Sequence, residues 1–91
     1  MYYTYVLKSL KNNKFYIGIT NNLSRRLSLH NKGRVKSTKS YAPWEVYYFE
    51  YFNTRKQAVS REKIIKSWKS REMIEKLKFN RSRGSSNSIE I

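Results

Sequence analysis

A chain of 91 residues has room for one domain, which buries roughly 60% of the surface that its unfolded chain exposes. It contains no cysteine, which excludes disulfides and thiolate metal sites, and no apolar run approaches the ~20 residues of a membrane span. Twenty Lys and Arg against six Asp and Glu give a net charge of +14, which favours nucleic acid over an anionic membrane as the partner. We therefore expect a cytoplasmic, nucleic-acid-binding protein.

The start of the chain predicts an antiparallel β-hairpin. Residues 2–8 and 15–19 are rich in β-forming residues, and the polar segment 9–14 between them is typical of a turn. Alternation along the first strand places one set of side chains on the same face: Tyr3, Tyr5 and Leu7. Tyr16 and Gly18 share a face of the second strand, and a glycine inside a strand usually marks a bulge or a close backbone approach.

A helix is expected next. Asn21 or Asn22 can cap its start, it should run to about Lys32, and Gly33 suits its end. The stripe of this helix that should be buried against the sheet consists of Leu23 and Leu27.

Two adjacent arginines of this helix should have different surroundings. Arg26 and His30 are four residues apart and lie beside the apolar stripe, so both should lean over the edge of the sheet. Arg25 is rotated by about 100° and should face solvent. The alternative is that Arg26 only packs its methylene groups on apolar surface, and that His30 is a packed polar residue.

The segment from residue 21 to residue 40 carries six cations and no acidic residue. Such a run is often just a solvated surface, but the complete absence of carboxylates favours contacts with phosphates. Part of it forms a basic loop that we expect between residues 33 and 43. The candidate nucleic-acid ligands are Arg25, Lys32, Arg34, Lys36 and Lys39.

The second half of the chain predicts a strand followed by two helices. Residues 45–52 read as the strand, Thr54 and Gln57 form a capping box for a helix over 55–68, and a shorter helix covers 70–78. The order β-β-α-β-α-α predicts an α+β fold, with a small three-stranded antiparallel sheet flanked by helices.

Domain organisation should be simple. We expect the domain to span residues 1–81 and the Ser-rich segment 82–91 to be a polar, disordered tail.

A carboxylate interrupts the buried stripe of the longer helix. Ala58 and Ile65 mark that stripe, and Glu62 lies between them at helical spacing. Burial of an unpaired carboxylate costs several kcal/mol, so Glu62 needs a partner. The pattern leaves two partners open: a metal ion, or a simple i,i+4 ion pair with Lys66.

A set of polar and aromatic residues occurs in a recognisable order between Tyr2 and Trp68. Its members are Tyr5-Val6, Tyr16-Ile17-Gly18, Asn22-Leu23, Arg26-Leu27, His30 and Glu62. This ordered set resembles the GIY-YIG nucleases, although Thr4 stands where the first motif has a glycine. The likeness is to small stand-alone bacterial members, which resemble the N-terminal nuclease module of the excision-repair subunit UvrC.

The resemblance implies an endonuclease that hydrolyses phosphodiester bonds in DNA with one divalent cation, Mg²⁺ or Mn²⁺, and that acts structure-selectively in repair or recombination. Either Tyr5 or Tyr16 would act as general base on the attacking water. Arg26 would neutralise charge on the phosphate, and His30 would position or relay protons. Glu62 would hold the cation.

The resemblance also implies that Gly18 lets its strand approach the phosphate or the first helix. Two other functions remain open from the sequence. One is a basic nucleic-acid-binding module with weak or no catalysis, and the other is an interaction protein whose charge only steers it to anionic partners.

Overall fold

The computed structural model of the chain describes residues 1–82, and the side chains of residues 1–78. In chain order, the elements of this part of the chain are β1 (Tyr2–Ser9), β2 (Phe15–Thr20), α1 (Leu23–Asn31), the 3₁₀ helix η1 (Lys39–Tyr41), β3 (Trp44–Phe52), α2 (Arg55–Trp68) and α3 (Arg71–Ser82). Apart from η1, this is the predicted order. The tail expected over residues 82–91 lies outside the described residues, except for Ser82.

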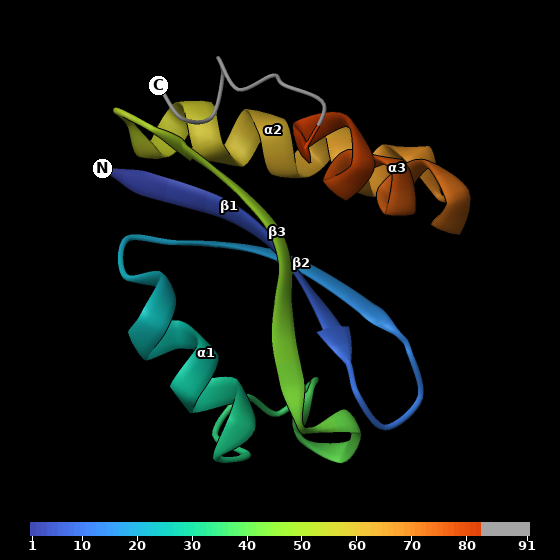
Figure 1. Cartoon of the computed structure of the whole chain (residues 1–91). Coiled ribbons are helices and arrows are strands. Elements are labelled where there is room, and N and C mark those ends of the chain that lie inside the picture. Colours follow the sequence, from blue (N-terminus) through green and yellow to red (C-terminus); the bar gives the residue numbers. More distant parts are fainter. Residues whose placement is uncertain (83–91) are drawn as a thin grey trace.

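The three strands form one antiparallel sheet in the order β2-β1-β3, which confirms the α+β fold. The central strand β1 pairs Tyr5 with Gly18 on β2 and with Phe49 on β3. Helix α1 lies on one face of the sheet, and α2 and α3 lie on the other (Figure 1). Two helices therefore cover one face, while α1 alone covers the other.

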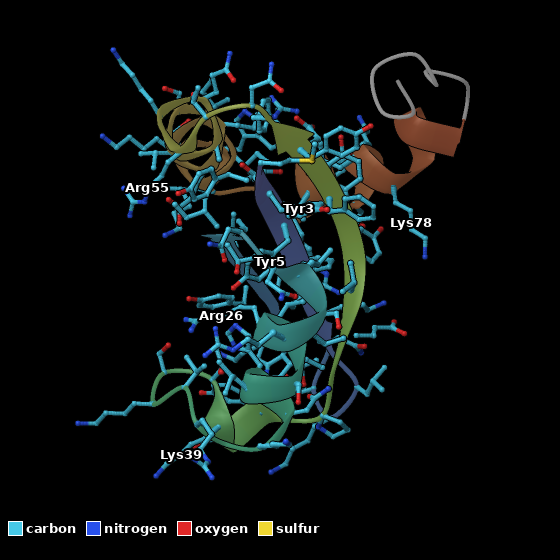
Figure 2. All side chains as sticks on the ribbon, turned by 90° about the vertical axis from the view of Figure 1, so that its left-hand side faces the viewer. Tyr3, Tyr5, Arg26, Lys39, Arg55 and Lys78 are labelled. Carbon is cyan, nitrogen blue, oxygen red and sulfur yellow. The ribbon has the colours of Figure 1, made fainter. Side chains whose placement is uncertain are left out.

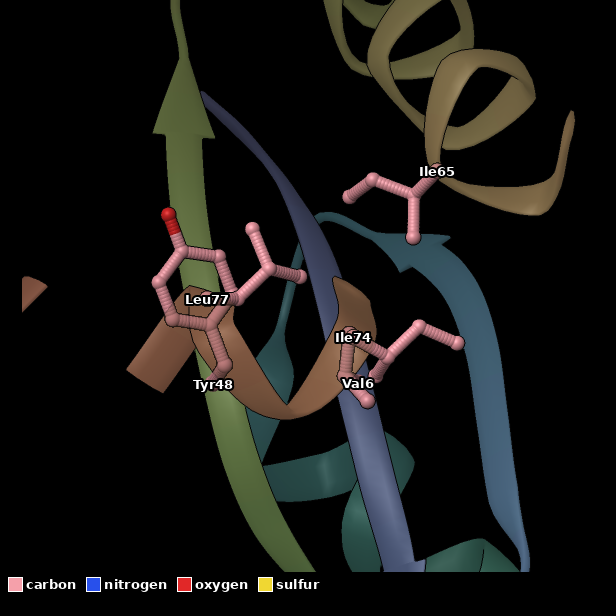
Figure 3. Packing of buried hydrophobic residues seen from close by; sticks show 5 residues of the cluster. All are labelled: Val6, Tyr48, Ile65, Ile74 and Leu77. Carbon is pink, nitrogen blue, oxygen red and sulfur yellow. The ribbon is translucent and has the colours of Figure 1, made fainter. Parts of the chain in front are cut away.

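Each face of the sheet has its own apolar cluster, because the side chains of β1 alternate between the faces. On the side of α2 and α3, one buried cluster consists of Val6, Tyr48, Ile65, Ile74 and Leu77 (Figure 3). On the side of α1, the buried cluster consists of Tyr5, Leu7 and Trp44. Each such side chain stabilises the fold by about 1.5–3 kcal/mol relative to an exposed one.

Helix α1 begins and ends as predicted, but its buried face differs from the prediction. The Asn22 side chain caps the helix by accepting from the backbone N–H of Arg25, and Gly33 follows with a φ of 74°. Leu23 and Leu27 are only partly buried. The buried residue of α1 is His30, and the two leucines pack against the cluster of Tyr5, Leu7 and Trp44 from a partly buried position.

Helix α2 is anchored to the sheet by polar contacts as well as by Ala58 and Ile65. The predicted capping box at its start is present. The Arg61 guanidinium donates two hydrogen bonds to one oxygen of Glu50 on β3, at 3.0 and 3.2 Å, and a third to the other at 3.1 Å. The buried Thr4 hydroxyl donates to the Ala58 carbonyl at 2.8 Å. The threonine that replaces the expected glycine thus joins β1 to α2.

Candidate active site

Tyr5 and Gly18 face each other across the central pair of strands. Tyr5 is almost completely buried, with 1% of its surface exposed. A Cβ atom added to Gly18 would lie 2.8 Å from the Tyr5 hydroxyl, which is too close, and 3.1 Å from the Tyr16 ring, which is a tight contact. Any larger residue at this position would therefore displace the Tyr5 ring. The close approach made by Gly18 is to these tyrosines, rather than to α1.

His30 lies at the end of α1, directed into the sheet and fully buried. Its Nε2 atom is 3.0 Å from the Tyr5 hydroxyl oxygen, Oη. The imidazole lies between aromatic rings, with the Tyr16 centroid at 4.9 Å and the Trp44 centroid at 6.5 Å. Burial, with a smaller contribution from the positive charge of Arg26, lowers the pKa of His30 to about 4. The imidazole is therefore neutral at physiological pH.

Arg26 reaches the same tyrosine from one turn earlier in α1. Its Nε–H donates to Tyr5 Oη at 3.4 Å, and this contact raises the pKa of Arg26. Burial raises the pKa of the Tyr5 phenol, the bond from Arg26 opposes that rise, and the nearby Tyr16 and Glu62 add to it. Arg25 is exposed, as its position on the helix predicts.

Glu62 lies on α2. Its negative charge makes the last and smallest of the contributions that raise the pKa of Tyr5. The ion pair with Lys66 that the sequence left open is present, with Nζ 3.1 Å from Oε2. The Glu62 side chain is 19% exposed, and Lys66 is 55% exposed. No other hydrogen bond to this carboxylate occurs in the described part of the chain, so its second oxygen can accept a ligand.

The donor set fits a weakly held, largely hydrated cation. Among residues 1–82, no three acidic or histidine side chains gather to form a metal cage. A single carboxylate suits Mg²⁺, which keeps several waters and completes its coordination with phosphate oxygens. Glu62 is therefore the residue that would hold such an ion.

The remaining predicted ligands form an exposed basic surface. Every cation predicted to bind nucleic acid is exposed: Arg25, Lys32, Arg34, Lys36 and Lys39. Arg26, Lys39 and Arg55 lie on one side of the molecule, and Lys78 lies on the opposite side (Figure 2). Arg55 was not predicted from the sequence, because it is separated from the basic segment by the whole of β3.

Thr38 is a second residue that the sequence did not indicate. It lies in the expected basic loop, yet it is 2% exposed, and its Oγ1 is 2.7 Å from His30 Nδ1. No periodic pattern connects a helix end to a loop residue eight positions later, so only the fold brings the two together.

Burial of neutral His30 predicts a pH-dependent stability. Because its folded pKa lies below the ordinary value of about 6.5, the unfolded chain binds a proton that the folded chain does not. The stabilisation is present above pH ~6.5 and is lost as pH falls towards the folded value, by about 2 kcal/mol at pH 5. Thermal melting between these pH values should show the loss, and His30→Gln should abolish this dependence. An equal dependence of melting temperature on pH in the wild type and in His30→Gln would contradict the assignment of this effect to His30.

Comparison with known proteins identifies the domain. The model of the GIY-YIG catalytic domain matches residues 1–78. The chain belongs to the GIY-YIG family. It is 43% identical over 67 residues to a UPF0213 protein of Clostridium perfringens, a match that covers 72% of this chain and 71% of that protein. It is 41% identical over 68 residues to a UPF0213 protein of Bacillus pumilus, covering 74% and 68%.

A solved structure of the same group supports the fold. The NMR structure of a UPF0213 protein from Bacillus halodurans is 29% identical, covers 85% of this chain and 82% of its own, and superposes with a TM-score of 0.52. These similarities show the GIY-YIG family and UPF0213 relatives, but they do not show the predicted closeness to the UvrC module.

A GIY-YIG catalytic domain indicates a nuclease with a nucleic-acid substrate, and nucleases of this family generally use a divalent metal. The names of the relatives state no activity. None of the described helices is both long and apolar enough to cross a membrane.

Proposed function

We propose that this protein is a divalent-metal-dependent endonuclease that hydrolyses phosphodiester bonds in DNA. One observation carries the proposal: a nitrogen of Arg26 and a nitrogen of His30 both lie within hydrogen-bonding distance of the Tyr5 hydroxyl oxygen. A buried tyrosine usually finds a hydrogen-bond partner, but here both nearby nitrogens belong to residues of the ordered set that resembles the nuclease family. The basic surface and the family of the domain support the same function.

Tyr5 is the general base of this proposal, in preference to Tyr16. A phenol has an ordinary pKa of about 10, so its oxygen must be stabilised before it can take a proton from water. Arg26 opposes the rise in pKa that burial causes at Tyr5, through its positive charge and its Nε–H. The Tyr16 ring lies 4.9 Å from His30, where it covers the imidazole. Tyr5→Phe should therefore abolish cleavage, whereas Tyr16→Phe should reduce it less.

Arg26 and Glu62 serve the phosphate. A guanidinium has five N–H donors, so Arg26 can donate one to Tyr5 and direct others at the oxygens of the scissile phosphate. A divalent cation held by Glu62 would stabilise negative charge on the leaving oxygen. The Lys66 side chain, which is more exposed, is free to turn away from Glu62 when the cation binds.

The contacts that this surface offers favour recognition of DNA shape. Lysine and arginine side chains bind backbone phosphates, and such contacts carry no sequence information. Selectivity would then come from the geometry of branched or nicked DNA, which suits a role in repair or recombination.

The function can be tested with labelled substrates. The protein should be incubated with linear duplex, branched duplex and single-stranded DNA, and with RNA of the same sequences, in Mg²⁺ or in EDTA. We expect cleavage of DNA in Mg²⁺, none in EDTA and none by Tyr5→Phe. Retention of DNA without cleavage under every condition would instead support a binding module, and cleavage of RNA alone would change the substrate class.

The basic surface predicts which cations contact the substrate. Arg55 lies on the side of Arg26 and Lys39, whereas Lys78 lies opposite (Figure 2). Each phosphate contact contributes about −0.9 to the slope of log affinity against log salt concentration. Arg55→Ala should make the slope shallower by about that amount, and Lys78→Ala should leave it unchanged. Fluorescence anisotropy with a labelled duplex measures the slope, and equal effects of both variants would place DNA elsewhere.

A further inference from the structure

An aromatic groove opens on the face of the sheet that carries α1, beside the start of that helix. It is lined by three rings from the strands, Tyr3, Phe49 and Tyr51, and by Leu23 and Leu27 of α1. Its volume is about 790 Å³, which is within the usual size of a site for a small organic group. Tyr51 is 37% exposed, so such a group can reach the rings from solvent.

The sheet holds the three rings in a defined arrangement. Tyr3 pairs with Tyr51 across β1 and β3, and its ring centroid lies 6.1 Å from that of Tyr51 and 5.8 Å from that of Phe49. Both contacts are edge-to-face, with interplanar angles of 66° and 67°. Rings packed in this way do not cover one another's faces, so a flat ligand can stack on one ring while its edge meets the next.

The aromatic groove lies next to the candidate active site. Phe49 pairs with Tyr5 across β3 and β1. Tyr3 precedes Tyr5 by two residues, so both side chains are on the same face of the sheet. A nucleotide in the groove would therefore neighbour the phosphate that the proposed mechanism places at Tyr5.

A smaller and more polar hollow shares two residues with the aromatic groove. Asn21 and Asn22 line both, and the smaller hollow also contains Arg25 and Arg26. The aromatic groove and this cationic hollow thus meet at the start of α1. Aromatic rings suit a base, amides suit the polar edge of a base, and guanidinium groups suit a phosphate, so together they match the parts of one nucleotide.

We infer that the aromatic groove binds an unpaired base of the substrate strand, beside the phosphate that is cleaved. Every base has a π face, so stacking on these rings needs no particular sequence. A base inside a duplex is already paired and stacked, so only a single-stranded or extruded nucleotide can enter. The net charge of +14 favours a polyanion over an apolar peptide as the occupant. This inference rests on the proposed function and narrows the substrate to DNA with an unpaired nucleotide at the site of cleavage.

The base site can be tested in EDTA, where no cleavage is expected. Fluorescence anisotropy compares the affinities of the protein for a labelled single strand and for a blunt duplex of the same sequence. Tyr51→Ala should weaken binding of the single strand about 5- to 150-fold, the usual effect of removing one stacking ring, and should leave duplex binding unchanged. Tyr51→Phe keeps the ring and should restore most of the affinity. Tyr51→Leu is apolar but has no π face, so it should resemble Tyr51→Ala.

A matched control separates stacking from the loss of any exposed apolar side chain. Ile64 is 48% exposed on α2 and does not line the groove, so Ile64→Ala should leave both affinities unchanged. Full single-strand affinity in Tyr51→Ala, or equal losses for single strand and duplex, would overturn the inference. A wild type that binds the single strand through Tyr51 but cleaves nothing in Mg²⁺ would remove the proposed function and leave the base site standing.

Discussion

Changing Arg26 to alanine should lower the rate of DNA cleavage about 10²–10³-fold, the usual loss when one charge-stabilising donor is removed. Arg25→Ala should only weaken DNA binding. The two residues are neighbours with the same chemistry, so a comparison of the two variants separates the effect of position from the effect of charge. Arg26 is partly buried and donates to Tyr5 Oη, whereas Arg25 is exposed.

The Arg25 and Arg26 variants should also differ in which kinetic constant changes. Because Arg26 would act on charge that develops during the reaction, its loss should appear in kcat. The loss of Arg25 should appear in KM and in the salt dependence of binding. Arg26→Lys tests the geometry: it keeps the charge, but not the planar fork that can serve Tyr5 and a phosphate together. Equal losses of kcat in the Arg25 and Arg26 variants would undo this assignment.

The elements of the fold could be predicted because local chemistry defines their ends. Asn22 and Thr54 cap their helices through their own side chains, and both signals are visible in a single sequence. Alternation in β1 correctly separated Tyr5 from Val6, since a strand has only two faces. The 3₁₀ helix η1 was not predicted, because it is too short to leave a periodic pattern.

The sequence predicted the part of the candidate site that depends only on the rotation of residues around one helix. The i,i+4 spacing of Arg26 and His30 places both on the side of α1 that faces Tyr5. The spacing could not show that His30, rather than Leu23 or Leu27, is the buried residue. The Trp44 ring, at the start of β3, lies 6.5 Å from the imidazole, and only the folded chain brings the two together.

Contacts between distant segments explain what was missed. Thr38 meets His30 only after the chain has turned back from α1, and Arg55 comes to the side of Arg26 and Lys39 only after β3 has run along the edge of the sheet. The sequence also could not show which of its two possible partners Glu62 has. The ion pair with Lys66 depends only on spacing within one helix. A metal site would depend in addition on the phosphate of a bound substrate.

Glu62→Gln should lower Mg²⁺-dependent cleavage by orders of magnitude while leaving the fold intact. The substitution keeps the shape of the side chain and removes the charge that attracts a cation. The stability cost should be small, because an i,i+4 ion pair with a half-exposed lysine contributes a few tenths of a kcal/mol. DNA binding in EDTA should be unchanged or slightly stronger, since a negative charge near the phosphate is gone.

Two control variants distinguish a metal ligand from a member of a surface ion pair. Glu72 pairs with Lys76 at i,i+4 on α3, with Nζ and Oε2 3.7 Å apart, and it is largely exposed. Glu72→Gln therefore removes a comparable pair and should leave cleavage unchanged.

Lys66→Ala breaks the Glu62 pair from its other side, and it should keep cleavage intact because the carboxylate remains. If the ion pair alone mattered, Lys66→Ala and Glu62→Gln would have equal effects on melting, and neither would affect cleavage. Full activity in Glu62→Gln, measured across a Mg²⁺ titration, would remove the metal site and with it the proposed role of Glu62 at the leaving oxygen.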